Sequence, residues 1–146
     1  MHIYDISMNC LLGDTNLDSV RDDLYATDKT INELHREVRR EMIIHSAVNS
    51  RNLDIPLLLS YMTMSKDIER IGDYCKNLFE IAETGNTFTK GGDLDSYIGL
   101  RNDIGKLIVY LQSCLNLEDE TKVHDLITLG SSISTDLNVV MVFGMM

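Results

Sequence analysis

Residues 57–82 read LLLSYMTMSKDIERIGDYCKNLFEIA, and this stretch decides the fold. Its apolar residues recur at steps of three and four positions, whereas those of a strand would alternate. This spacing puts them on one side of an α-helix and predicts a helix that packs along one face. The residues of this apolar stripe are Leu57, Tyr61, Met64, Ile68, Ile71, Cys75, Leu78 and Ala82.

A second stripe with the same steps precedes the first, and a break at residues 49–53 separates the two helices. We expect Asn16 to cap the first helix and Asp54 to cap the second. Pro56 then falls in the first turn, where its missing N–H is not needed. The earlier stripe consists of Leu17, Val20, Leu24, Thr27, Ile31, Leu34, Val38, Glu41, His45 and Val48.

The short break makes the two helices antiparallel neighbours. In such a hairpin, residues at equal height have position numbers with a nearly constant sum. The two stripes pair in this way from Leu24 with Ala82 to Val48 with Leu57, with sums of 105 or 106. We therefore expect the two stripes to register with each other along the hairpin.

Helical periodicity continues beyond the hairpin. Residues 84–93 contain Gly85, Gly91 and Gly92 and are the clearest loop in the chain. Two further helices are expected, at about residues 94–116 and 118–143. The sequence therefore predicts an all-α antiparallel helical bundle of four main helices, preceded by a short partial one.

The composition excludes several classes of protein. The chain has 146 residues, enough for a single domain spanning 1–146, and its formal net charge is −10. Such an acidic chain repels phosphate backbones, so nucleic acid is excluded as a partner. No apolar run is long enough to span a bilayer. The three cysteines are odd in number and widely spaced, which is typical of a reduced, cytosolic protein.

Polar residues beside the two stripes could bind a metal ion. Glu69 and Asp73 are four positions apart, so both carboxylates project from one face of their helix. Asp28 and Asn32 lie on the partner helix, and Asn32 is expected level with Asp73. Oxygen ligands of this kind suit divalent and trivalent metals. The alternative interpretation is a solvated acidic face, which is the commoner role of such residues. No catalytic motif is visible, so an enzyme is not expected.

The stretch Ser65–Glu83, with its core Asp67-Ile68-Glu69-Arg70-Ile71-Gly72-Asp73, closely resembles the signature helix of the PhoU family. The preceding helix, around Asp28–Glu37, resembles that family as well. The resemblance implies a fold of three-helix repeats, with one repeat best matched over residues 5–84. Residues 94–143 would then form part of a second repeat.

This resemblance also implies a function, that of a regulator of phosphate transport and phosphate signalling. Family members act in the cytoplasm as adaptors that contact a phosphate-transporter ATPase or a sensor kinase. Some bind iron or zinc through an acidic pattern that Glu69 and Asp73 match. Asp28 matches the other half of that pattern, and Asn32 departs from it, because the family has a carboxylate there. The metal ligands implied by the resemblance are therefore Asp28, Asn32, Glu69 and Asp73.

Two further expectations concern association. The alternative to a metal-binding adaptor is a metal-free helical module for protein interaction or dimerisation, such as the cytoplasmic regulatory domain of a sodium–phosphate cotransporter. A partial second repeat should also leave apolar surface at residues 139–143, which read VVMVF. We expect self-association to cover that surface, so that the chain forms a homodimer or another homo-oligomer.

Overall fold

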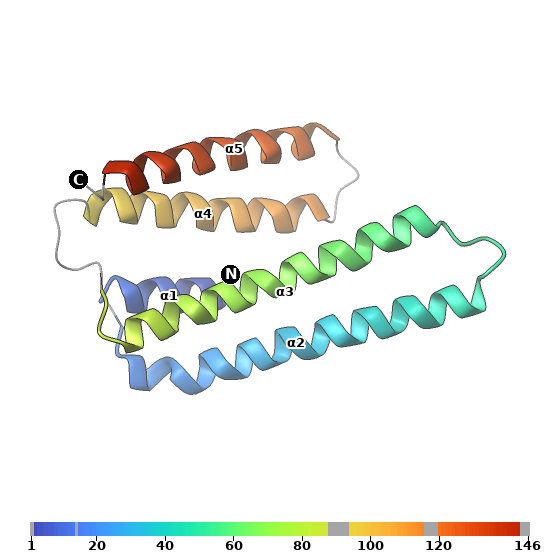
Figure 1. Cartoon of the computed structure of the whole chain (residues 1–146), viewed down its shortest axis with the longest axis horizontal. Coiled ribbons are helices and arrows are strands. Elements are labelled where there is room, and N and C mark those ends of the chain that lie inside the picture. Colours follow the sequence, from blue (N-terminus) through green and yellow to red (C-terminus); the bar gives the residue numbers. More distant parts are fainter. Residues whose placement is uncertain (1, 14, 88–93, 116–119, 144–146) are drawn as a thin grey trace. The chain divides into compact units, whose positions relative to one another are not determined.

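The computed structural model describes residues 2–13, 15–87, 94–115 and 120–143, and these residues form five helices and no strand. The helices are α1 (His2–Leu11), α2 (Leu17–Val48), α3 (Ile55–Glu83), α4 (Leu94–Leu115) and α5 (Glu120–Phe143). Figure 1 shows α2 and α3 as the longest pair, running side by side. The prediction of an all-α fold, with four main helices after a short one, is confirmed.

The contacts divide the chain into two compact units. One comprises residues 6–87, which hold the hairpin of α2 and α3 together with the second half of α1. The other comprises α4, α5 and the first residues of the chain. The division falls between α3 and α4, close to the predicted repeat boundary. The prediction that residues 1–146 make a single domain stays a prediction.

The helix ends of the hairpin follow the predicted capping chemistry. The Asp18 N–H donates to Asn16 Oδ1 over 2.9 Å at the start of α2. The Leu57 N–H donates to Asp54 Oδ1 over 3.0 Å at the start of α3, and Pro56 lies in the first turn. Each cap satisfies an N–H that has no partner within the helix. Both predicted caps, and the break between the helices, are confirmed.

Three contacts between α2 and α3 fix their register. Arg21 pairs with Glu83 over 2.7 Å, and Asp28 pairs with Lys76 over 3.9 Å. Gly72 lies so close to Ile31 that a Cβ at Gly72 would be 3.1 Å from the Ile31 Cδ1 atom. The position numbers of these pairs add to 104, 104 and 103. The antiparallel register is therefore as predicted, to within one to three residues.

The two apolar stripes are not buried along their whole length. Leu34 in the middle of α2 and Leu57 at the start of α3 remain 54% and 51% exposed. Ile31 of the α2 stripe lies against Gly72, which stands beside the α3 stripe and is not part of it. The stripes therefore border a groove on one side of the hairpin rather than pack against each other.

The other unit is a second helix pair, in which α4 packs against α5. Tyr4 Oη donates to the Arg101 carbonyl oxygen over 2.9 Å, and Arg101 pairs with Asp5 over 3.7 Å. Ile133 contributes a buried side chain from α5. The apolar side chains at 139–143, on which the self-association prediction depends, lie outside the described residues.

Two chain-wide properties bear on function. Among the described residues, no helix combines the length and apolar character needed to cross a membrane. Cys10, Cys75 and Cys114 are not joined by disulfide bonds.

Candidate functional site

The candidate site lies on α2 and α3 near the middle of the hairpin. Glu69 is a buried residue of α3, at 8% exposed. It accepts a hydrogen bond from the Lys66 ammonium, one turn earlier on the same helix. This hydrogen bond holds the pKa of Glu69 below its usual value, and burial acts in the opposite direction with a smaller effect. The carboxylate at this position is therefore ionised and already paired with a cation.

Across the hairpin, Asp28 is also close to a cation. Its Oδ2 atom lies 3.9 Å from Lys76 Nζ on α3, and its side chain is only 13% exposed. Asn32 is one turn further along α2, where its Nδ2 donates to the Asp28 carbonyl oxygen over 3.1 Å. The Asn32 amide is thus engaged with its own helix through that nitrogen.

His35 contributes a third polar side chain to this region of the hairpin. Its electrostatic interaction with Glu69 is one of the smaller contributions to the lowered pKa of that carboxyl, so the two residues lie near each other across the hairpin. Two buried atoms, Asp28 Oδ1 and His35 Nε2, have no hydrogen-bond partner among the described residues. Such atoms are costly to desolvate and are open to a further ligand or a proton.

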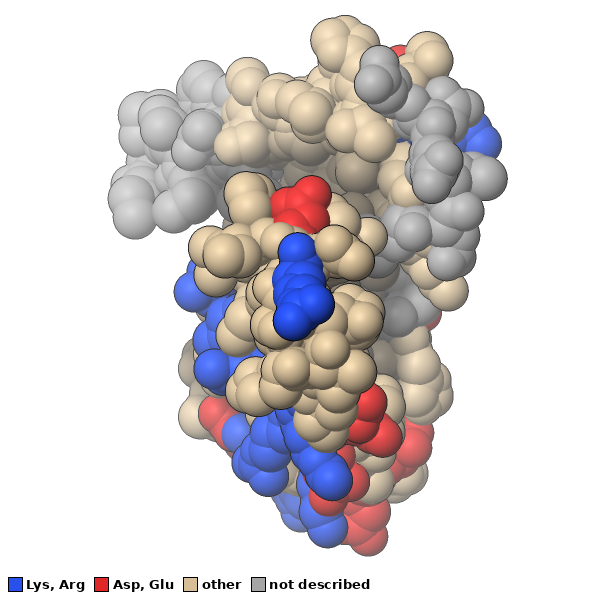
Figure 2. Space-filling view, turned by 90° about the vertical axis from the view of Figure 1, so that its right-hand side faces the viewer, with Lys and Arg blue, Asp and Glu red and all other residues tan. Residues whose placement is uncertain are grey.

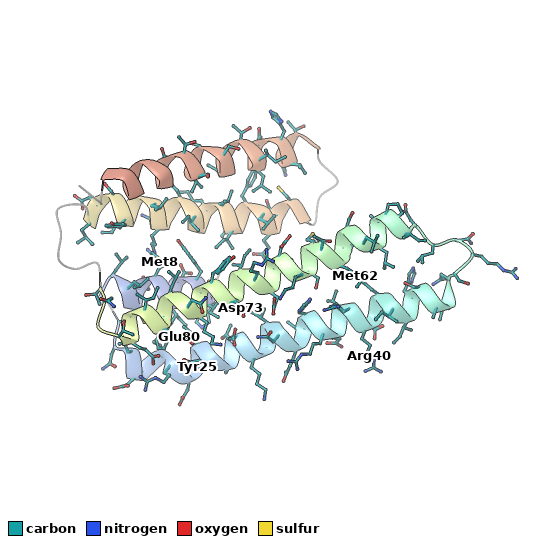
Figure 3. All side chains as sticks on the ribbon, viewed as in Figure 1. Met8, Tyr25, Arg40, Met62, Asp73 and Glu80 are labelled. Atoms are coloured by element: carbon teal, nitrogen blue, oxygen red, sulfur yellow. The ribbon has the colours of Figure 1, made fainter. Side chains whose placement is uncertain are left out.

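Asp73 is the fourth predicted ligand. It follows Glu69 by one turn of α3 and is half-buried (Figure 3). Nearby, Arg70 pairs with Asp67 over 3.5 Å. The structure therefore brings the predicted residues to one region of the hairpin, on two adjacent helices.

The arrangement does not by itself make a metal centre. In the part of the chain that the structure describes, no three His, Cys, Asp or Glu side chains come close enough together to hold a metal ion. Ammonium groups lie beside Asp28 and Glu69, where a metal would need unpaired oxygen ligands. Metal binding at Asp28, Asn32, Glu69 and Asp73 gains no support from this geometry and stays a prediction.

Sequence reasoning missed the roles of Lys66 and Lys76 in this region. Lys76 extends from α3 across to Asp28 on α2. The constant-sum rule contained the signal, because Asp28 and Lys76 sit at nearly equal height in the hairpin. Lys66 precedes Glu69 by three positions, a spacing at which side chains on a helix meet.

Comparison with known proteins identifies the same region. Residues 4–82 match the PhoU domain family. The Phosphate-specific transport system accessory protein PhoU homolog 1 of Thermotoga maritima is 33% identical over 57 residues. These are 39% of this chain and 24% of the relative, so the match spans about a quarter of that protein's length. No solved structure matches the chain.

Proposed function

The chain belongs to the PhoU domain family, and from this premise we propose that it is a regulatory adaptor in phosphate transport and phosphate signalling. The observation that carries the proposal is the family match over residues 4–82, which includes the hairpin of α2 and α3 except its last residue, Glu83. The Thermotoga relative supports it, since its name describes an accessory protein of a phosphate-specific transport system.

We infer that the adaptor acts by contact rather than by catalysis. Its partner would be a phosphate-transporter ATPase or a sensor kinase, met in the cytoplasm. Among the described residues, the absence of a helix able to span a membrane is compatible with a chain that reaches such partners from one side. The polar middle of the hairpin, with Glu69 and Asp73 on α3, is the region that we expect the regulation to require.

A genetic experiment tests this function. The chain is expressed in a bacterial strain that lacks its own PhoU protein, and a phosphate-starvation reporter is measured in phosphate-rich medium. The chain should lower the reporter, and Asp73→Ala should lose that effect although it accumulates normally. Asp22→Ala, an exposed carboxylate on α2, is the matched control and should behave as the parent chain does. A folded parent chain that leaves the reporter unchanged would contradict the proposal.

The proposal includes bound iron or zinc at Asp28, Asn32, Glu69 and Asp73 as its least supported part. Elemental analysis of protein purified without chelator should find about one metal or more per chain, and Asp73→Ala should lower that content. The unfolding temperature should rise when the metal is added back. If no stoichiometric metal is found and iron, zinc and manganese leave the unfolding temperature unchanged, the metal is rejected and the adaptor function stands alone.

A metal-free interaction or dimerisation module is the second candidate function, for example as the cytoplasmic regulatory domain of a sodium–phosphate cotransporter. Two observations favour it over the metal-binding version. The lysines beside Asp28 and Glu69 already neutralise those carboxylates, and apolar side chains remain exposed at the tip of the hairpin. The same elemental analysis separates the two candidates.

A further inference from the structure

The exposure of one stripe changes abruptly along α3. Tyr61, Ile68, Cys75 and Ala82 are spaced by seven residues, so they lie in one row on one side of the helix. Their exposed fractions are 47%, 41%, 2% and 1%. The row is therefore covered at the end of α3 near Glu83 and open along its first half.

α1 and the buried end of the row belong to the same end of the hairpin. Residues 12–16 connect α1 directly to α2, so the last turns of α1 lie near the end of the hairpin where α2 begins and α3 ends (Figure 1). The 32 residues of α2 extend roughly 48 Å from there, so the first half of α3 lies at the far end, near the connection at residues 49–54.

The uncovered part forms an apolar groove between α2 and α3. The groove has a volume of about 680 Å³, and Leu34, Val38, Leu57 and Tyr61 are among its apolar lining residues. On α2 the lining extends from Leu34 to His45, which is roughly 17 Å or three helical turns. This length and shape suit an α-helix laid into the groove through one apolar face.

The charges at the groove have one sign. Glu37, Glu41 and Asp54 line it, and no Lys or Arg is among the described residues that do so. A separate hollow of the same hairpin is lined by three cations, Arg39, Lys66 and Arg70, and by one carboxylate, Asp67. Figure 2, which looks at the tip of the hairpin, shows basic and acidic side chains gathered on different sides of its lower part.

We propose that this groove, which we call the distal groove, binds an amphipathic helix of a partner protein whose apolar stripe is flanked by Lys or Arg. The apolar residues of that helix would enter between Val38 and Tyr61, and its cations would face Glu37 and Glu41. Opposite charges at the rim of an interface select the partner and speed the encounter. The inference goes beyond the proposed function and does not depend on a role in phosphate regulation.

Charge argues against a second copy of the chain that docks through the same groove. In a symmetric dimer through this face, Glu37, Glu41 and Asp54 would meet the same carboxylates of the other copy. The chain also carries a net charge of −10, so two copies repel each other at long range. A basic helix has the complementary charge and relieves this repulsion.

The experiment uses the full chain and three labelled peptides of about 15 residues, a length that forms about four helical turns. The first has Leu at helical spacing flanked by Lys. The second replaces each Lys with Glu, and the third keeps the Lys and Leu composition in scrambled order. Fluorescence anisotropy should show the Lys peptide binding at least about tenfold more tightly than the other two. Equal affinity for all three peptides would overturn the proposal.

Variants of the protein locate the binding. The double substitution Glu37→Lys, Glu41→Lys should lower the affinity for the Lys peptide by about tenfold or more and raise the affinity for the Glu peptide. Glu33→Lys places the same charge on α2 outside the groove lining and is the matched control, with little effect expected. Tyr61→Ser, at a half-exposed position, should weaken both peptides while the circular dichroism spectrum stays unchanged. Loss of binding in the control as large as in the double variant would refute the groove as the binding site.

Sedimentation of the protein alone tests the other occupants. Oligomers that grow with concentration and disappear in the Glu37→Lys, Glu41→Lys variant would show that the groove binds the basic side of a second copy of the chain. Binding of the Lys peptide only after deletion of residues 137–146 would assign it to this chain's own C-terminal stretch. Either result overturns the proposal, and a monomer that binds the Lys peptide without deletion supports it.

Discussion

The close approach of α2 and α3 at Gly72 makes a quantitative prediction for Gly72→Ala. A Cβ at this position would lie 3.1 Å from Cδ1 and 3.3 Å from Cγ2 of Ile31. Ordinary contacts between carbon atoms are about 3.5–4.0 Å, so Ile31 would have to shift. Overpacking of this kind lowers the free energy of unfolding by about 1–3 kcal/mol. Alanine in place of glycine inside a helix raises it by about 1 kcal/mol. We expect net destabilisation of up to about 2 kcal/mol.

Gly130 on α5 supplies the matched control. A Cβ there would meet no heavy atom within 4 Å, so Gly130→Ala should show only the helix preference and stabilise by up to about 1 kcal/mol. Urea unfolding followed by circular dichroism measures both variants, with the two units fitted as separate transitions if they separate. The reasoning predicts opposite signs for the two glycines.

A double-mutant cycle with Ile31→Val isolates the contact. Valine lacks the Cδ1 atom that lies closest to the new methyl group, so Gly72→Ala should be less harmful in that background. A coupling free energy of at least about 0.5 kcal/mol is expected for residues in contact. If Gly72→Ala stabilises the chain as much as Gly130→Ala does, the helices approach less closely than described and the reasoning fails.

Three further predictions follow from burial and capping. Phe79→Ala, at a fully buried position, should destabilise by about 3–5 kcal/mol in urea unfolding, whereas Tyr61→Ala should cost less than half as much because its side chain is already half-exposed. Asp54→Ala removes the cap of α3 and should lower the free energy of unfolding by about 1 kcal/mol, and an unchanged value would mean that the cap is dispensable. Burial raises the pKa of the Cys10 thiol, so at pH 8 mass spectrometry should find Cys114 alkylated well before Cys10, and the reverse order would contradict the described burial.

The sequence predicted the local features of the hairpin well because short-range chemistry determines them. Asn16 and Asp54 are caps, since their side chains accept from N–H groups two and three residues later. The register followed from the length of the break and from two helical periodicities. These features depend on neighbours in sequence and on the fixed rise of a helix.

The sequence did not predict which way the apolar stripes face. Periodicity shows that Leu57 and Tyr61 share a side of α3, but not whether a third helix covers that side. The answer depends on contacts between residues far apart in the sequence, which periodicity does not reveal. The candidate site was limited in a similar way. Helical spacing placed Glu69 and Asp73 together, but it did not show that a lysine side chain already reaches Asp28.

The uneven burial along the hairpin has a consequence for motion as well as for binding. A hairpin that is buried at one end and exposed at the other should open most easily at the exposed end, so backbone amides near the tip should exchange with solvent faster than those near Leu24 and Phe79. A helix docked at the tip would then have to order that end, and part of its binding free energy would be spent on doing so. Occupancy would be reported as slowed exchange at the tip alone, and the anchored end of the same two helices would stay unchanged.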